Sequence, residues 1–167
     1  APHHAGTIHI SPTLDYIERA FDDAKYGRPS KEPVLEITLP SSVDPTLAPP
    51  GHHVMSIWML YAPVRLAKGS WDQRRQEVGE DMIKVLSQYA PDIEDCIVDW
   101  SLFTPWDIEQ RVGMTDGNIR HLDIIPGQFL DKRPLQGWAG YETPVRHLYL
   151  CGSGTHPGGD VSGAPGH

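Results

Sequence analysis

The chain has 167 residues, of which 39% are hydrophobic and 22% charged, and its formal net charge is −8 at pH 7. This acidic excess provides no basic stripe for a nucleic-acid backbone or an anionic membrane surface, so both are excluded as partners. Since no apolar run approaches the ~20 residues that span a bilayer, we expect a protein of the bacterial cytoplasm or, in a eukaryote, of the mitochondrial matrix.

The first forty residues predict a strand, a helix and a second strand. Residues 7–10 are apolar enough for a short strand, and Ser11 followed by a proline is typical of a helix start. Apolar residues then recur at helical spacing until Gly27, which predicts an amphipathic helix. Residues 34–39 alternate between apolar and polar, so we expect a half-buried strand that Pro40 ends.

The middle of the chain predicts two more strands and two helices. Residues 41–51 are rich in proline and indicate an extended surface connection, whereas 54–61 are almost wholly apolar and predict a central strand covered on both faces. Residues 70–89 begin with a capping box and carry an apolar stripe, which predicts a helix. Residues 96–102 alternate like a strand, and 105–113 predict a short helix.

Residues 114–143 contain turn signals and no periodic pattern, so we expect a long irregular segment, of the kind that is usually functional or held by a partner. Strands and helices mix without a regular βαβ repeat. The sequence therefore predicts the α+β class, with a mixed, largely antiparallel sheet and helices on one face.

The last twenty residues combine a strand pattern with a glycine block. The run 145–151 is β-branched and aromatic, and the block that follows it contains Gly152, Gly154, Gly158 and Gly159. Without a Cβ, successive backbone N–H groups can converge on an anion or a flat ring. The block completes neither a dinucleotide fingerprint nor a P-loop, so a structural turn and a ligand loop both stay open.

Other chemistries find less support. Ser153 and His156 could be imagined in a hydrolase triad, but Cys151 stands where the nucleophile elbow requires glycine. The nine histidines show no metal-ligand spacing, so we expect no metal site. Cys96 and Cys151 lie in apolar runs without paired spacing, and we expect both to be buried free thiols.

Residues 148–159, Leu-Tyr-Leu-Cys-Gly-Ser-Gly-Thr-His-Pro-Gly-Gly, resemble the C-terminal flavin-contacting motif of the phytoene desaturase and amine oxidase superfamily of FAD-dependent oxidoreductases. The resemblance is greatest to the branch that includes pyridine nucleotide-disulphide oxidoreductase domain-containing protein 2. Further segments similar to that branch are 5–9, 48–51, 89–91, 117–119 and 141–144. The resemblance therefore extends through nearly the whole chain.

The resemblance implies an FAD-dependent oxidoreductase that removes hydride from a carbon–carbon or carbon–nitrogen bond of a small apolar substrate. The cofactor-binding residues that it implies are Gly152, Ser153, Gly154, Thr155, His156, Gly158, Gly159, Val161 and Ser162. Trp138 and Tyr141 precede this motif in a glycine-containing loop, and we expect them near the flavin ring and the substrate. No catalytic base can be named.

Similar enzymes carry a Gly-x-Gly-x-x-Gly turn near their N-terminus, and none of the 167 residues matches it. The resemblance thus implies a C-terminal part: residues 1–144 from a substrate-type domain and 145–167 from the FAD-binding domain, whose N-terminal Rossmann part would be the missing partner. Many relatives have an acidic residue in place of Ser153 and a glycine in place of Asp160. A non-catalytic binding or oligomerisation module is the alternative, and homo-oligomerisation stays open.

Overall fold

The computed structural model describes residues 2–159 and 163–166, and the chain forms two compact units, 1–104 and 105–167. The first unit contains a three-stranded antiparallel sheet in the order β1 (Ile8–Ile10), β2 (Val34–Thr38) and β3 (Ser56–Leu60). The predicted α+β class is confirmed, and both strand pairs are antiparallel. The domain limits predicted at residue 144 concern the whole family protein and stay a prediction.

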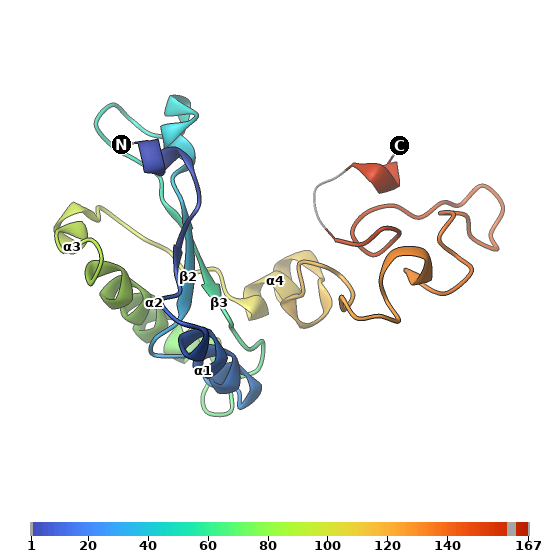
Figure 1. Cartoon of the computed structure of the whole chain (residues 1–167), viewed down its shortest axis with the longest axis horizontal. Helices are drawn as coiled ribbons and strands as arrows, with labels where there is room; N and C mark the ends of the chain where they lie inside the picture. Colours follow the sequence, from blue (N-terminus) through green and yellow to red (C-terminus); the bar gives the residue numbers. More distant parts are fainter. Residues whose placement is uncertain (1, 160–162, 167) are drawn as a thin grey trace. The chain divides into compact units, whose positions relative to one another are not determined.

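Helix α2 (Trp71–Ser87) covers one face of this sheet (Figure 1). The cross-strand row Ile10, Leu35 and Met59 faces the helix, because residues in register lie on the same side of a sheet. The buried residues of the helix that complete this core are Trp71, Val78, Met82, Val85 and Leu86. The predicted capping box is present, with the Ser70 N–H donating to Gln73 Oε1 at 3.1 Å.

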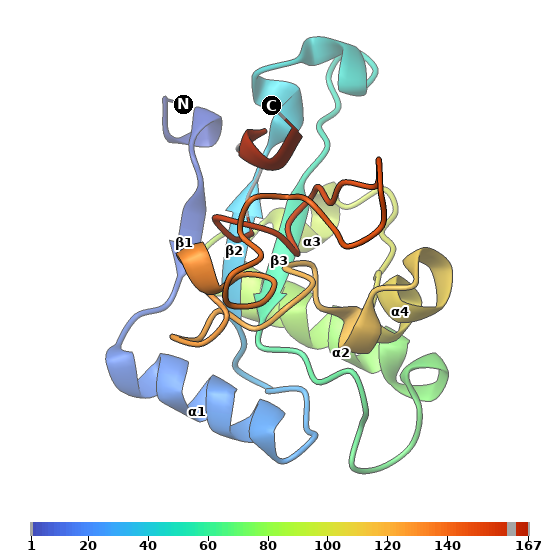
Figure 2. The same ribbon diagram turned by 90° about the vertical axis from the view of Figure 1, so that its right-hand side faces the viewer.

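Helix α1 (Leu14–Lys25) lies at the end of the sheet where β1 ends and β2 begins (Figures 1 and 2). Its N-cap is Thr13, whose hydroxyl accepts from the Tyr16 N–H at 3.1 Å. The start predicted at Ser11 is therefore wrong by two residues. Thr13 is also a residue type that caps helices, and it is the Thr13 hydroxyl that accepts from a backbone N–H of the first turn.

Three further predictions for the first unit need correction. β3 is shorter than residues 54–61 and lies at the sheet edge, with Trp58 44% exposed, while β2 is the central strand. The connection over residues 41–51 was expected to be extended, but it contains the 3₁₀ turns η2 (Pro40–Ser42) and η3 (Pro45–Leu47). Another 3₁₀ turn, η1 (Pro2–Ala5), lies at the N-terminus.

The predicted strand 96–102 is absent from the described structure. Helix α3 (Ile93–Cys96) occupies its start, and the backbone from Ile97 onward forms no strand pairing. This segment packs against α2 instead: Arg75 Nη1 donates to the Leu102 carbonyl, and the Trp100 ring lies at Gly79. An alternating sequence becomes a strand only where a neighbouring strand accepts its backbone hydrogen bonds.

Where the structure describes the second unit, it contains helix α4 (Pro105–Val112), as predicted, and the 3₁₀ turns η4 (Thr115–Gly117), η5 (Leu130–Lys132) and η6 (Ala164–Gly166). The expected irregular segment 114–143 is confirmed. None of the helices in the described ranges is long and apolar enough to cross a membrane.

The buried strand predicted over residues 145–151 is wrong. Only Tyr149 pairs, through a single bridge to Glu142, and the Leu150 N–H donates to the Tyr141 carbonyl at 2.8 Å. Val145 is 60% exposed and Tyr149 is 64% exposed. The sequence has strand propensity here, but the described part of this unit offers no adjoining strand and no covering layer.

Candidate functional site

The candidate site is the C-terminal loop, residues 152–159, which begins in a tight turn. Gly152 has φ +87°, a conformation that other residues rarely adopt. Its carbonyl accepts from the N–H of Thr155 at 3.1 Å and from the Thr155 hydroxyl at 2.8 Å. Thr155 is only 3% exposed, so the threonine closes the turn from inside.

The last two glycines of the loop lie close to neighbouring side chains. A Cβ on Gly158 would lie 3.3 Å from the ring of Phe129, and one on Gly159 would lie 2.8 Å from Cδ of Arg120. Gly158 also has φ +136°. By contrast, a Cβ on Gly152 would meet nothing within 4 Å, so this end of the loop faces open space. The open end is where a ligand could approach the backbone.

Arg133 connects the loop to the preceding segment and was missed by the sequence analysis. Its side chain is fully buried, at 0% exposure, and its Nε donates to the Ser153 carbonyl at 2.8 Å. The other guanidinium nitrogens donate to the carbonyls of Arg120, Leu122, Asp123 and Gln128. The Leu130 N–H adds a bond to the Pro157 carbonyl at 3.1 Å. A single arginine in a segment without periodicity carries no sequence pattern that would mark it as buried.

The two aromatic residues predicted near the substrate, Tyr141 and Trp138, differ in their contacts. Tyr141 packs edge-on against His156, with ring centroids 6.4 Å apart and an interplanar angle of 62°, so the fold brings this predicted pocket residue to the loop. Trp138 is 39% exposed, and its ring stacks on no other ring within the described ranges. Nδ1 of His156 is buried and has no hydrogen-bond partner among the described residues. No Ser153–His156 hydrogen bond occurs in that same part of the chain. The roles predicted for Trp138, Tyr141 and His156 stay predictions.

Three predicted positions, Asp160, Val161 and Ser162, lie outside the described residues. The prediction of buried thiols is wrong, because Cys96 and Cys151 are both exposed and free. Cys96 ends the short helix α3, and Cys151 ends the segment that pairs only through one bridge, so neither lies in a covered strand. Among residues 2–159 and 163–166, no group of three His, Cys, Asp or Glu side chains could hold a metal ion.

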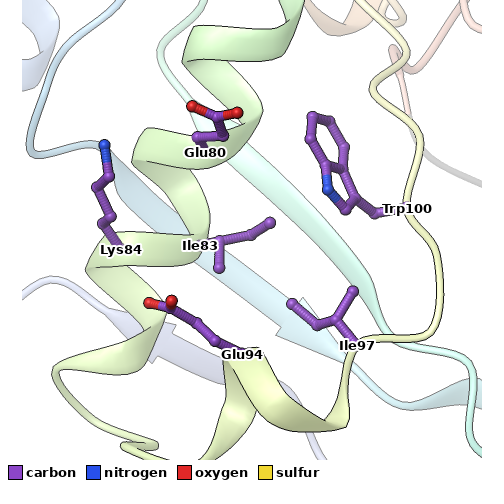
Figure 3. A pocket seen from close by; sticks show the side chains of 6 residues that line it. All are labelled: Glu80, Ile83, Lys84, Glu94, Ile97 and Trp100. Carbon is purple, nitrogen blue, oxygen red and sulfur yellow. The ribbon is translucent and has the colours of Figure 1, made fainter.

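A cavity of about 360 Å³ lies in the first unit, beside α2 and α3 (Figure 3). Its lining residues are Glu80, Ile83, Lys84, Glu94, Ile97 and Trp100. The Lys84 ammonium group points away from Trp100 and lies 3.7 Å from the Asp81 carboxylate. No sequence pattern predicts this cavity, since residues 96–102 alternate like a strand.

No family model matches the chain. It is 42% identical to pyridine nucleotide-disulfide oxidoreductase domain-containing protein 2 of Rattus norvegicus, with 98% of the chain and 29% of that protein covered. It is 30% identical to a 4,4'-diapophytoene desaturase of Staphylococcus aureus, over 87% of the chain and 28% of that protein. A phytoene desaturase of Pseudescherichia vulneris is 28% identical over 77% of the chain and 26% of that protein. The chain thus spans less than a third of the length of these relatives.

Proposed function

Because the chain belongs to the superfamily of phytoene desaturase-like oxidoreductases, as a C-terminal part of it, we propose that it completes the cofactor site of an FAD-dependent oxidoreductase. The substrate class is a small apolar molecule with an oxidisable carbon–carbon or carbon–nitrogen bond. The similarity over 98% of the chain to a much longer oxidoreductase is the observation that carries this proposal.

The residues of the C-terminal loop are suited to a flavin dinucleotide. The Gly152 end of the loop is open, and the amides of Ser153 and Gly154 donate to no acceptor in the described part of the chain. Backbone N–H groups of this kind bind phosphate oxygens without basic side chains. FAD, when bound, would accept the hydride. The chain's own contribution is to hold phosphate and ribityl oxygens at Gly152, Ser153 and Gly154 and to place Tyr141 beside the loop. Thr155, predicted as a direct contact, is buried and donates to the Gly152 carbonyl, so it would hold the turn that presents these amides.

One observation is compatible with the alternative, a non-catalytic binding or oligomerisation module. Residues 145–150 include several exposed apolar side chains, among them Val145 at 60%, Leu148 at 50% and Tyr149 at 64%. Such an uncovered apolar segment is typical of an interaction surface. In an oxidoreductase the remainder of the protein would cover the same segment, so this observation fits both functions.

Two measurements test the proposal. The full-length oxidoreductase should be yellow, with flavin absorption in the visible range and a released cofactor that comigrates with FAD. The 167-residue chain alone should bind FAD weakly, because it lacks the Gly-x-Gly-x-x-Gly turn that holds the adenine-side pyrophosphate. A colourless full-length protein that forms a stable dimer would favour the non-catalytic module. An FAD dissociation constant below about 1 μM for the chain alone would contradict the proposal that the chain carries only part of the FAD site.

A further inference from the structure

Arg133 is the most completely buried charged residue of the described structure, and its hydrogen bonds go to backbone alone. The guanidinium makes five contacts with carbonyl oxygens, those of Ser153 and Gln128 at 2.8 and 2.9 Å, Asp123 at 2.9 Å, Arg120 at 2.6 Å and Leu122 at 3.4 Å. A guanidinium has five N–H donors, so each donor has an acceptor. No carboxylate pairs with it within residues 2–159 and 163–166.

A buried cation is costly unless it is fully hydrogen-bonded, and here the compensation comes from peptide dipoles. The five carbonyls turn their negative ends toward Arg133. Four of them belong to residues 120–128 and one to the C-terminal loop, so the arginine fixes the loop against this segment. Replacing the side chain would leave several buried carbonyls without a partner.

The bond to Ser153 also determines which way the next amide points. The Ser153–Gly154 peptide is trans, and in a trans peptide the C=O and the N–H point in opposite directions. Because Arg133 draws the Ser153 carbonyl inward, the Gly154 N–H is directed outward. In the same way Thr155 holds the Gly152 carbonyl, which directs the Ser153 N–H away from Thr155. Two successive amides are thus oriented by two buried side chains.

We propose that Arg133 is the positioning residue of the cofactor loop. Its guanidinium sets the peptide after Ser153 so that the N–H of Gly154 donates to a phosphate oxygen of the bound dinucleotide, and its buried charge adds to the positive potential at that amide. Arg133 itself does not touch the cofactor. This inference rests on the proposed function and assigns a role to a residue outside the glycine motif.

The test uses the full-length oxidoreductase with FAD as the probe. Arg133→Gln removes the charge and most donors, and Arg133→Lys keeps the charge but not the planar fork. The matched control is Arg146→Gln, which removes the same charge from an exposed arginine of the same unit. We expect FAD affinity to fall about tenfold or more in Arg133→Gln, less in Arg133→Lys, and not at all in Arg146→Gln.

Two further measurements separate positioning from general stability. Amide hydrogen exchange at residues 152–155 should slow on FAD binding in the wild type and not in Arg133→Gln. The FAD-induced rise in melting temperature should shrink in the order wild type, Arg133→Lys, Arg133→Gln. If Arg133→Gln does not fold, Arg133→Lys gives the answer by itself.

The outcomes are distinguishable. A wild-type protein that binds no FAD would overturn both the proposed function and this inference. FAD binding in the wild type with unchanged affinity in Arg133→Lys and in any folded Arg133→Gln would overturn the inference alone. Equal losses in Arg133→Gln and Arg146→Gln would also overturn it, since the effect would then be one of net charge.

Discussion

The indole ring of Trp100 lies against the backbone of α2 at Gly79, so closely that a Cβ at this position would overlap ring atoms Cζ3 and Cη2. A glycine inside a helix ordinarily costs about 0.5–1 kcal/mol relative to alanine. Here the missing side chain makes room for the ring, which anchors the irregular segment after α3 to the helix. The same ring forms one wall of the cavity (Figure 3).

The contact predicts that Gly79→Ala destabilises the 167-residue chain, against the usual effect of this substitution in helices. Overpacking against a ring that must move costs about 1–3 kcal/mol, which outweighs the gain in helix propensity. Urea unfolding followed by far-ultraviolet circular dichroism measures the difference.

The double variant Gly79→Ala with Trp100→Ala is the control for this first prediction. Once the ring is absent, the added methyl group meets no obstacle, and alanine should stabilise relative to Trp100→Ala alone by about 0.5–1 kcal/mol. Stabilisation by Gly79→Ala in the presence of Trp100 would contradict the contact.

A second prediction concerns alkaline pH. Burial, with smaller contributions from Glu32 and Tyr89, raises the pKa of Tyr16 from its ordinary 10.0 to about 12, and the hydroxyl donates to the Pro33 carbonyl at 2.9 Å. Above pH 10 the unfolded phenol loses its proton while the folded one keeps it, so the folded state binds more protons. The stabilisation from Tyr16 is therefore complete below pH 10 and is lost as the pH rises to about 12.

Tyr16→Phe isolates this contribution from the other groups that titrate at high pH. At about pH 8 the variant should be less stable by about 1 kcal/mol, because the buried Pro33 carbonyl loses its donor. The gap between wild type and variant should close between pH 10 and 12 in urea unfolding at matched ionic strength. If the difference in unfolding free energy stays constant over this interval, the pKa of Tyr16 is not raised in the folded chain.

The third prediction uses the two exposed thiols, Cys96 and Cys151. Both should react with an aromatic disulfide reagent in the native 167-residue chain, without denaturant, since thiol reactivity follows exposure. Cys96→Ser and Cys151→Ser should each halve the absorbance released. If either thiol reacts only after urea is added, the segment that carries it is covered in solution, as an associating chain would require.

Much of the first unit could be predicted from the sequence. The strands near residues 8–10 and 34–38 and the capped helix from Trp71 follow from alternation, helical spacing and capping residues, as does the helix from Pro105 in the second unit. These signals act within a few neighbours along the chain. The family resemblance likewise rested on a contiguous stretch, residues 148–159, so the candidate loop was found without coordinates.

Only the tertiary structure decided the order of the strands, which side chains are buried, and the contacts of Arg133. The apolar run 54–61 gives an edge strand and 145–151 gives almost no strand, because pairing requires a partner whose presence the local sequence does not encode. Cys96 and Cys151 lie in segments whose apolar composition is typical of buried strands. In the described part of the chain, however, both side chains are exposed. Arg133 became visible only when the fold brought carbonyls from 120–128 and 153 around one side chain, since a backbone acceptor is the same in every residue and leaves no trace in the sequence.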